Sequence, residues 1–160
     1  MSISRGMMNP QIRSMIAKGI KAEGVSYMAV FAGEHNPPFI YSVGLFPVLG
    51  YEVLMIGIRP STAYAIVSGI TLALVTGEII AKDGERIEGE KNRFLNLPFM
   101  FKSVERNPQT WEKYTVQAES WWACKMPIFQ IVLSDSSGKL PEDEGFNTEQ
   151  MDPIQPLLYK

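Results

Sequence analysis

The amino-acid sequence predicts an α+β domain with a mainly antiparallel sheet, or a partly open barrel, of five to six strands and three helices. Short runs rich in β-branched and aromatic residues are bounded by glycine, proline and asparagine, which is typical of strands and turns. Three longer segments begin at a proline-containing cap signal and repeat apolar residues at helical spacing. A length of 160 residues with 46% hydrophobic residues provides one core, and no repeat or linker divides the chain, so residues 1–160 are expected to form a single domain.

The first expected elements are an N-terminal helix and a pair of strands. Asn9 and Pro10 are a typical N-cap and first-turn pair, and the helical segment, residues 1–24, ends at a glycine. Its apolar residues at helical spacing are Ile12, Met15, Ile16 and Ile20. Runs 25–31 and 39–46 are expected to pair as antiparallel strands, because the segment between them is rich in turn-forming residues.

A buried strand and a buried helix are expected next. Segment 52–58 is apolar at nearly every position, which is typical of a strand covered on both faces and predicts a central place in the sheet. Residues 59–62, Arg-Pro-Ser-Thr, then begin a helix that runs to about Thr76, where Gly77 suits a left-handed C-cap. Because apolar residues surround this helix, we expect it to be buried, with its first turn facing solvent.

Two shorter strands and a third helix follow. Residues 78–82 are expected to form a short strand, residues 83–91 a charged loop or hairpin, and residues 99–104 another strand. The third helix begins at the cap pair of residues 107 and 108. The residues expected to share its inward face are Trp111, Tyr114, Thr115, Ala118 and Trp122.

The last strand and a tail complete the expected fold. Residues 128–133 form a strand rich in β-branched residues, which ends at a Ser-Ser-Gly turn. The acidic, proline-containing segment 136–160 is expected to wrap the surface as a tail.

Charge and cysteine content narrow the class of protein. With 15 basic and 17 acidic residues the net charge is -2, so the composition gives no strong indication of nucleic-acid binding. The single cysteine, Cys124, excludes an internal disulfide, and with one histidine no metal site is expected. Residues 1–9 lack a secretory signal, and the most apolar stretch, 63–75, is too short to span a membrane. We therefore expect a cytoplasmic protein with no membrane partner.

One segment resembles the signature of a known family. Residues 36–45 are Asn-Pro-Pro-Phe-Ile-Tyr-Ser-Val-Gly-Leu, and they resemble the Pro-Pro-Phe-x-Tyr-Thr-Val-Gly-Leu motif of a mostly bacterial family, domain of unknown function 4262. Segments 52–58, 129–132 and 155–158 are similar to weaker motifs of that family, so the resemblance spans most of residues 24–158. It implies a fold unit and carries over no particular activity.

The order of the elements is also similar to that of flavin-reductase-like split barrels. In those proteins a strand pair precedes a helix whose serine or threonine start holds a cofactor phosphate. This likeness implies FMN or another nucleotide as the cofactor to test, although likeness at the level of fold does not carry function.

The start of the second helix is the candidate anion or phosphate site. Unpaired backbone N–H groups there meet the cation of Arg59 and the hydroxyls of Ser61 and Thr62, a combination that binds anions. The alternative is structural: Ser61 or Thr62 caps the helix, and Arg59 pairs with a surface carboxylate. The sequence leaves both interpretations open.

A second group of residues consists of polar and aromatic side chains near the apolar strands, in a turn, or at the end of the third helix. Polar groups among apolar strands need a partner or a cavity, so these residues are candidates for lining a pocket. The alternative is that they lie on an outer face or bond to a neighbouring loop. The members are His35, Tyr41, Ser42, Glu52, Trp121, Trp122 and Gln130.

The sequence contains no recognisable set of catalytic residues, and we assign none. It predicts a non-catalytic binding protein, of the inhibitor or immunity type, that contacts a protein partner through an aromatic-rich surface and the acidic tail. The alternative is a small-molecule domain that binds a phosphate-bearing ligand such as a nucleotide or flavin, with oxidoreductase activity. A homodimer is compatible with both functions.

Overall fold

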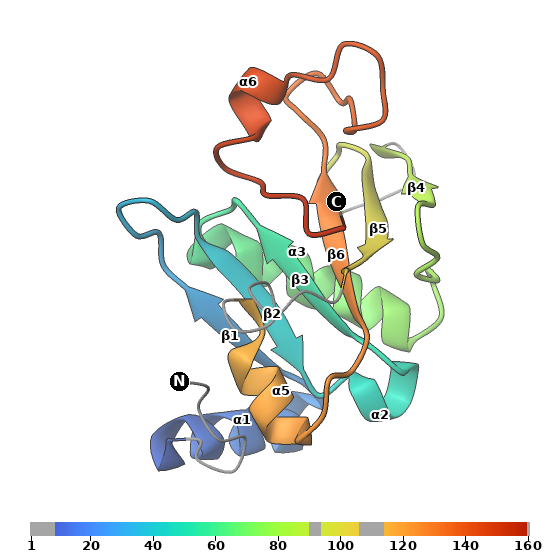
Figure 1. Cartoon of the computed structure of the whole chain (residues 1–160). Helices are drawn as coiled ribbons and strands as arrows, with labels where there is room; N and C mark the ends of the chain where they lie inside the picture. Colours follow the sequence, from blue (N-terminus) through green and yellow to red (C-terminus); the bar gives the residue numbers. More distant parts are fainter. Residues whose placement is uncertain (1–8, 90–93, 106–113, 160) are drawn as a thin grey trace.

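The computed structural model describes residues 9–89, 94–105 and 114–159, which form a sheet with helices on both faces (Figure 1). The α+β class is confirmed. In chain order the elements are α1 (Pro10–Glu23), β1 (Ser26–Val30), β2 (Phe39–Val43), α2 (Phe46–Leu49), β3 (Glu52–Ile56), α3 (Pro60–Val75), β4 (Arg86–Ile87), β5 (Phe99–Ser103), α5 (Val116–Trp122), β6 (Ile128–Leu133) and α6 (Thr148–Met151). None of the described helices has the length and hydrophobicity needed to cross a membrane.

The sheet is mixed and open. Its six strands lie in the order β1-β2-β3-β6-β5-β4, and every neighbouring pair is antiparallel except the parallel central pair, β3 and β6. The expectation of a partly open barrel is wrong, because β1 and β4 are separate edges on opposite sides of the sheet (Figure 1). Closure would require these edges to pair, and β4 contributes only two residues.

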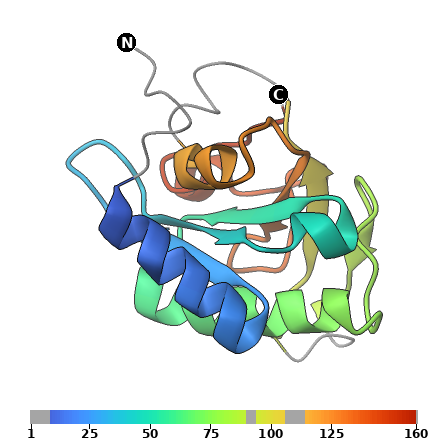
Figure 2. The same cartoon turned by 90° about the horizontal axis from the view of Figure 1, so that it is seen from below.

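Two hydrophobic layers cover the sheet, with α3 on one side and α5 on the other (Figure 2). Successive residues of a strand point to opposite faces, and β3 follows this rule. Met55 packs with the residues of α3, whereas Leu54 packs in the cluster that contains Ile16 of α1 and Ala118 of α5. The expectation of a central strand buried on both faces is therefore confirmed.

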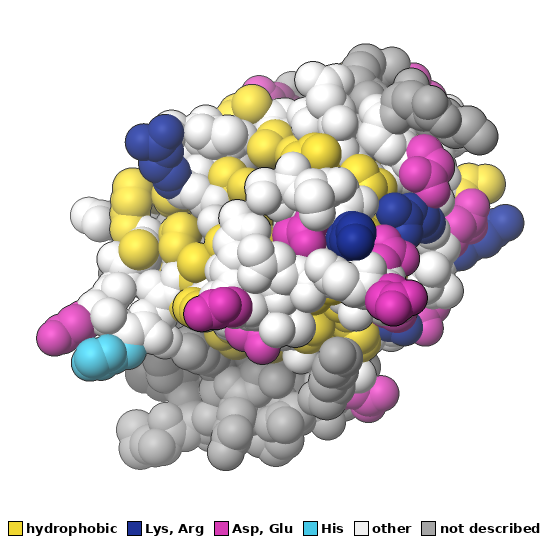
Figure 3. Space-filling view, turned by 90° about the horizontal axis from the view of Figure 1, so that it is seen from above, with side chains coloured by type: hydrophobic (Ala, Val, Ile, Leu, Met, Phe, Trp, Pro, Cys, Tyr) yellow, Lys and Arg dark blue, Asp and Glu magenta, His cyan; other side chains and the backbone are white. Residues whose placement is uncertain are grey.

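Because β3 and β6 are parallel, their carboxyl ends lie together on one side of the sheet, at the top of Figure 1. Figure 3 looks down on these strand ends. Acidic and basic side chains are mixed on one side of the view, whereas hydrophobic side chains gather towards the other side and the centre.

The described residues contain five helices, whereas three were expected. α2 and α6 have four residues each, which is too short for an apolar period to reveal them. The strand expected over 39–46 ends at Val43, because the chain turns at Gly44 with φ 138 before α2 begins. Tyr114 and Ala118 are buried as expected, whereas residues 106–113, with the expected start of the third helix and Trp111, lie outside the described residues.

The strand expected over 78–82 is not formed. The backbone N–H of Ile79 donates to the carbonyl of Ala73 in α3, so the start of this segment closes the end of the helix, and residues 78–82 pair with none of the described strands. The outer strand β4 instead lies in the segment expected to be a loop or hairpin, with Arg86 opposite Met100 of β5. A strand of two residues shows no alternation that sequence reasoning can detect.

Hydrogen bonds from two side-chain amides hold the segment after β6 against the sheet. Gln155 accepts from the backbone N–H of Leu133 at 2.8 Å and donates to the carbonyl of the same residue at 3.1 Å. Gln130 donates to the carbonyl of Pro156 at 2.8 Å and accepts from the N–H of Leu158 at 2.9 Å. The amide of Gln155 thus satisfies both backbone groups of Leu133, and the amide of Gln130 satisfies backbone groups of the segment around Pro156.

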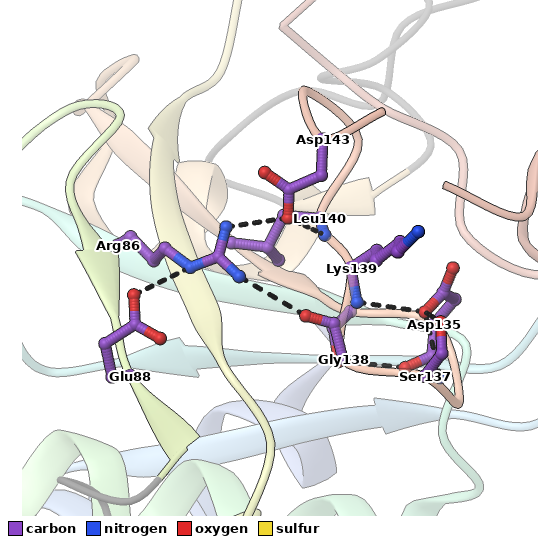
Figure 4. A network of polar contacts seen from close by, with 9 residues as sticks. Arg86, Glu88, Asp135, Ser137, Gly138, Lys139, Leu140 and Asp143 are labelled. Carbon is purple, nitrogen blue, oxygen red and sulfur yellow. Dashed lines mark hydrogen bonds and ion pairs between the residues drawn. The ribbon is translucent and has the colours of Figure 1, made fainter. Parts of the chain in front are cut away.

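Asp135 organises the turn that begins this segment (Figure 4). Its carboxylate accepts from the backbone N–H groups of Lys139 and Asn147, both at 2.9 Å, and from the hydroxyl of Ser137 at 2.8 Å. These hydrogen bonds, with that of Lys139 the largest contribution, lower the pKa of Asp135 to about 2. Figure 4 also shows Arg86 of β4 donating to Asp143 at 2.7 Å, which joins the sheet edge to the same turn.

Asp135→Asn should destabilise the protein at pH 7 but much less near pH 2. The folded-state pKa of Asp135 is lowered from 3.8 to about 2, so the stabilisation is complete above the unfolded value and is lost as the pH falls through the folded value. Urea unfolding of both proteins from about pH 7 to about pH 2 measures the difference. Ser137→Ala removes one donor and should have a smaller effect in the same pH window. A difference that stays constant down to pH 2 would contradict this role of the carboxylate.

Candidate functional site

Glu52, at the first position of β3, lies at the centre of a buried hydrogen-bond cluster. Its Oε1 accepts from the hydroxyl of Ser42 at 2.7 Å and from the backbone N–H of Leu45 at 3.0 Å. Its Oε2 accepts from the backbone N–H groups of Gly44 and Phe46, each at 3.0 Å. A fifth donor, the indole N–H of Trp122 in α5, reaches the same Oε2 at 2.8 Å.

The local sequence explains why the chain forms this cluster. A Cβ at position 44 would lie 2.8 Å from the carbonyl oxygen of Gly24 and 2.9 Å from the Cα of Val25, so only glycine lets the backbone approach there. Its φ of 138 is also one that other residues rarely adopt. The turn at Gly44 points consecutive N–H groups at the carboxylate, and the hydroxyl of Ser42 also accepts from the N–H of Val53 at 2.9 Å.

The cluster is closed to solvent. Glu52 and Ser42 are both 0% exposed. Burial raises the pKa of Glu52, and the hydrogen bonds from Gly44, Ser42, Phe46 and Leu45 oppose that rise. All five hydrogen bonds to the Glu52 carboxylate come from donors. Glu52 therefore acts as an acceptor that binds the turn after β2 to α5.

The other residues singled out as pocket candidates lie in several places. Tyr41 is buried beside the cluster, where its hydroxyl accepts from the N–H of Gln117 at 3.1 Å, and burial raises its pKa. Trp121 is half-buried, with the guanidinium of Arg13 at 5.6 Å from its ring. The side chain of His35 is 85% exposed in the loop between β1 and β2, where it is accessible to water.

The structure therefore brings together Ser42, Glu52 and Trp122, with Tyr41 nearby, and separates them from His35 and Gln130. The buried polar members bond to neighbouring segments: Glu52 to the turn after β2, and Gln130 to the chain near Pro156. This matches the structural alternative that the sequence left open for these two residues.

The start of α3 is exposed to solvent, as expected. Arg59, Ser61 and Thr62 are all exposed, and no side chain makes a capping hydrogen bond at this helix end. The cap by Ser61 or Thr62 that the sequence allowed is therefore not formed. Binding of an anion, FMN or another nucleotide at these three residues stays a prediction.

Away from these residues, the described surface includes two hollows beside the sheet and α3. One, of about 170 Å³, lies where β3 and β6 end and is lined by residues that include Gly57, Ser134 and Asp135. The other, of about 250 Å³, lies between α3 and β1, and its lining residues are Glu23, Val25, Tyr27, Ser68, Thr71, Leu72 and Val75. Its polar floor is the contact between the hydroxyls of Tyr27 and Thr71, and burial raises the pKa of Tyr27 to about 12.

A family model described as Domain of unknown function (DUF4262) matches residues 19–147. The chain belongs to the DUF4262 family. No curated protein and no solved structure matches it. In this DUF4262 chain, Ser42, Gly44 and Leu45, which lie within residues 36–45, all donate hydrogen bonds to Glu52 of the next strand.

The outer surface of α3 is the largest departure of this DUF4262 protein from expectation. α3 was expected to be buried, but it forms an outer layer, with Leu72 60%, Val75 47% and Tyr64 46% exposed (Figure 2). Residues 60–77 contain no charged side chain. The apolar residues all around this helix were interpreted as a sign of complete burial. A helix of the same composition can also leave one side exposed as a contact surface for another molecule. We give the name α3 face to the exposed residues Ser61, Tyr64, Ala65, Leu72 and Val75 together with the half-buried Ser68.

Proposed function

We propose that the chain binds a protein partner without chemical turnover and that the α3 face is its contact surface. The observation that carries the proposal is the exposure of Leu72 and Val75, 60% and 47%, on a helix without charged residues. Apolar side chains gathered on a surface mark interaction sites, because association removes them from water. An inhibitor or immunity protein would act through a surface of this kind.

The position of the polar groups supports the same proposal. Ser42, Glu52 and Gln130 are 0% exposed and make their hydrogen bonds within the chain. The hollows at the strand ends and beside α3, of about 170 and 250 Å³, are smaller than the roughly 300–1,000 Å³ of sites that enclose a drug-sized ligand. Contact with another protein requires a complementary surface and no deep cavity.

The photo-crosslinking amino acid p-benzoylphenylalanine at position 72 tests this surface in living cells of the natural host. Illumination should give a discrete crosslinked product, because the group would lie inside the contact. The matched control places the same amino acid at Val48 of α2, which is 66% exposed and does not belong to the α3 face. Equal labelling from both positions, or no product from position 72, would overturn the proposal.

A further inference from the structure

The pattern of residues on the α3 face is complementary to itself. We infer that this face binds a second copy of the chain, with the two α3 helices packed antiparallel about a two-fold axis near Ser68. The inference rests on the proposed function and names the partner. The same patch on both subunits forms the contact, which is the usual geometry of a symmetric dimer.

The spacing of the outward residues fits a helix-to-helix seam. Ser61, Ala65, Ser68, Leu72 and Val75 follow one another at alternating intervals of four and three residues. This alternation keeps one stripe of a helix facing a partner helix. All five are exposed or partly exposed, so the stripe is open along the whole length of α3.

The sizes of these side chains select the antiparallel arrangement. Small residues, Ser61 and Ala65, occupy the first half of the seam, and large ones, Leu72 and Val75, occupy the second half. Ser68 lies at the middle of Pro60–Val75, so an antiparallel pair sets each large side chain against a small one. A parallel pair would oppose large to large and small to small, which leaves gaps at one end.

Charge at the two ends of the helix selects the same arrangement. Arg59 immediately precedes α3 and Glu78 lies three residues after Val75, with no charged residue between them. Both side chains are exposed. In an antiparallel pair, Arg59 of each copy lies near Glu78 of the other, whereas a parallel pair brings like charges together. The helix dipoles also oppose each other favourably in the antiparallel pair.

Tyr64 is compatible with this seam although it is large and lies in the first half of the helix. Its ring packs edge-on against Tyr27 of β1, with 5.4 Å between the ring centroids. Its hydroxyl donates to Glu23 at 3.4 Å. These contacts hold Tyr64 to the side of the stripe, towards β1, so Ser61 and Ala65 stay open to the partner helix.

Cysteine crosslinking tests the position of the two-fold axis. In a Cys124→Ser background, Ser68→Cys places the two thiols opposite each other across the axis, and mild oxidation should give a disulfide-linked dimer. Thr62→Cys is the matched control, because it is exposed on the same helix but points about 120° away from Ser68. The Ser68→Cys protein should crosslink at least about tenfold faster than the control. Equal rates, or no dimer from Ser68→Cys, would overturn the inference.

Sedimentation of the unmodified full-length chain from about 1 to about 500 µM measures association directly. The wild-type protein should dimerise, and Leu72→Glu should weaken the dimer at least about tenfold, whereas Val48→Glu should leave it unchanged. Arg59→Glu and Glu78→Arg should each weaken the dimer, and the double variant should restore it, because the two changes exchange the charges of one pair. A wild-type chain that remains monomeric, or a double variant without rescue, would overturn the antiparallel dimer.

The two proposals fail in different ways. A chain that sediments as a monomer, while p-benzoylphenylalanine at position 72 still crosslinks to a different protein, overturns self-association and leaves the α3 face as a contact surface. A crosslinked product with the mass of two copies of this chain supports both. Failure of crosslinking at position 72 together with monomeric sedimentation overturns both.

Discussion

Glu52→Gln should lower the free energy of unfolding by about 3–5 kcal/mol. Oε1 accepts two hydrogen bonds and Oε2 accepts three, all from donors that are buried or partly buried. An amide has one accepting oxygen, so at least two donors would face the NH₂ group of glutamine in either orientation. Each buried donor left without an acceptor costs about 1–3 kcal/mol, so a nearly isosteric change has a large effect.

Urea unfolding at neutral pH measures this loss. The control is Glu34→Gln, which makes the same chemical change on a side chain that is 90% exposed and should shift stability by less than about 0.5 kcal/mol. Trp122→Phe removes one donor and leaves the carboxylate its other four, so it should fall between the two. If Glu52→Gln proved as stable as Glu34→Gln, the cluster would not be the structural centre that its geometry indicates.

Gly44→Ala should destabilise the protein by about 3 kcal/mol or more, and Gly50→Ala by only about 1–2 kcal/mol. Both glycines have positive φ, 138 and 86, so each substitution strains the backbone. Only at Gly44 would the new Cβ meet backbone atoms, at 2.8 Å from the Gly24 oxygen, whereas nothing lies within 4 Å at Gly50. The extra cost at Gly44 is therefore the cost of moving α1 away from the turn that binds Glu52.

Thermal and urea unfolding of the two alanine variants give this comparison. Gly50→Ala serves as the control for backbone strain alone. Equal losses at both positions would show that the turn moves freely and that the close approach of the Gly24 and Gly44 segments carries no energy. In the Gly44→Ala protein, the indole of Trp122 should also become more accessible to quenchers, because the turn and α5 share the Glu52 carboxylate.

Local patterns predicted most of the fold. The strand 128–133 was predicted with its observed bounds, and the helix from Pro60 was predicted to within one residue of its end, because β-branched runs and proline caps act within a few neighbouring residues. The parallel pairing of β3 with β6 could not be predicted in this way. It joins Glu52 to Ile128, and no local pattern records which distant strand becomes a neighbour.

The candidate sites show the same difference between what local patterns predict and what distant contacts determine. Glu52 was identifiable as a polar residue in an apolar strand, but its five donors come from Ser42, the turn after β2 and Trp122, which only the tertiary structure brings together. The exposed side of α3 was missed for a related reason. Residues 60–77 contain no charged side chain. This composition does not distinguish a helix covered by the rest of the protein from one covered by a second molecule.

The place of β6 in the sheet has a consequence for synthesis on the ribosome. β6 lies between β3 and β5, so the growing chain carries β1, β2 and β3 as a local meander while the inner edge of β3 stays open. That edge is filled only after Leu133 has left the exit tunnel, and β5 and β4 can join the meander only through β6. Nascent chains that stop before this point expose the hydrophobic edge of β3 to aggregation, and chaperone binding should be strongest in that interval.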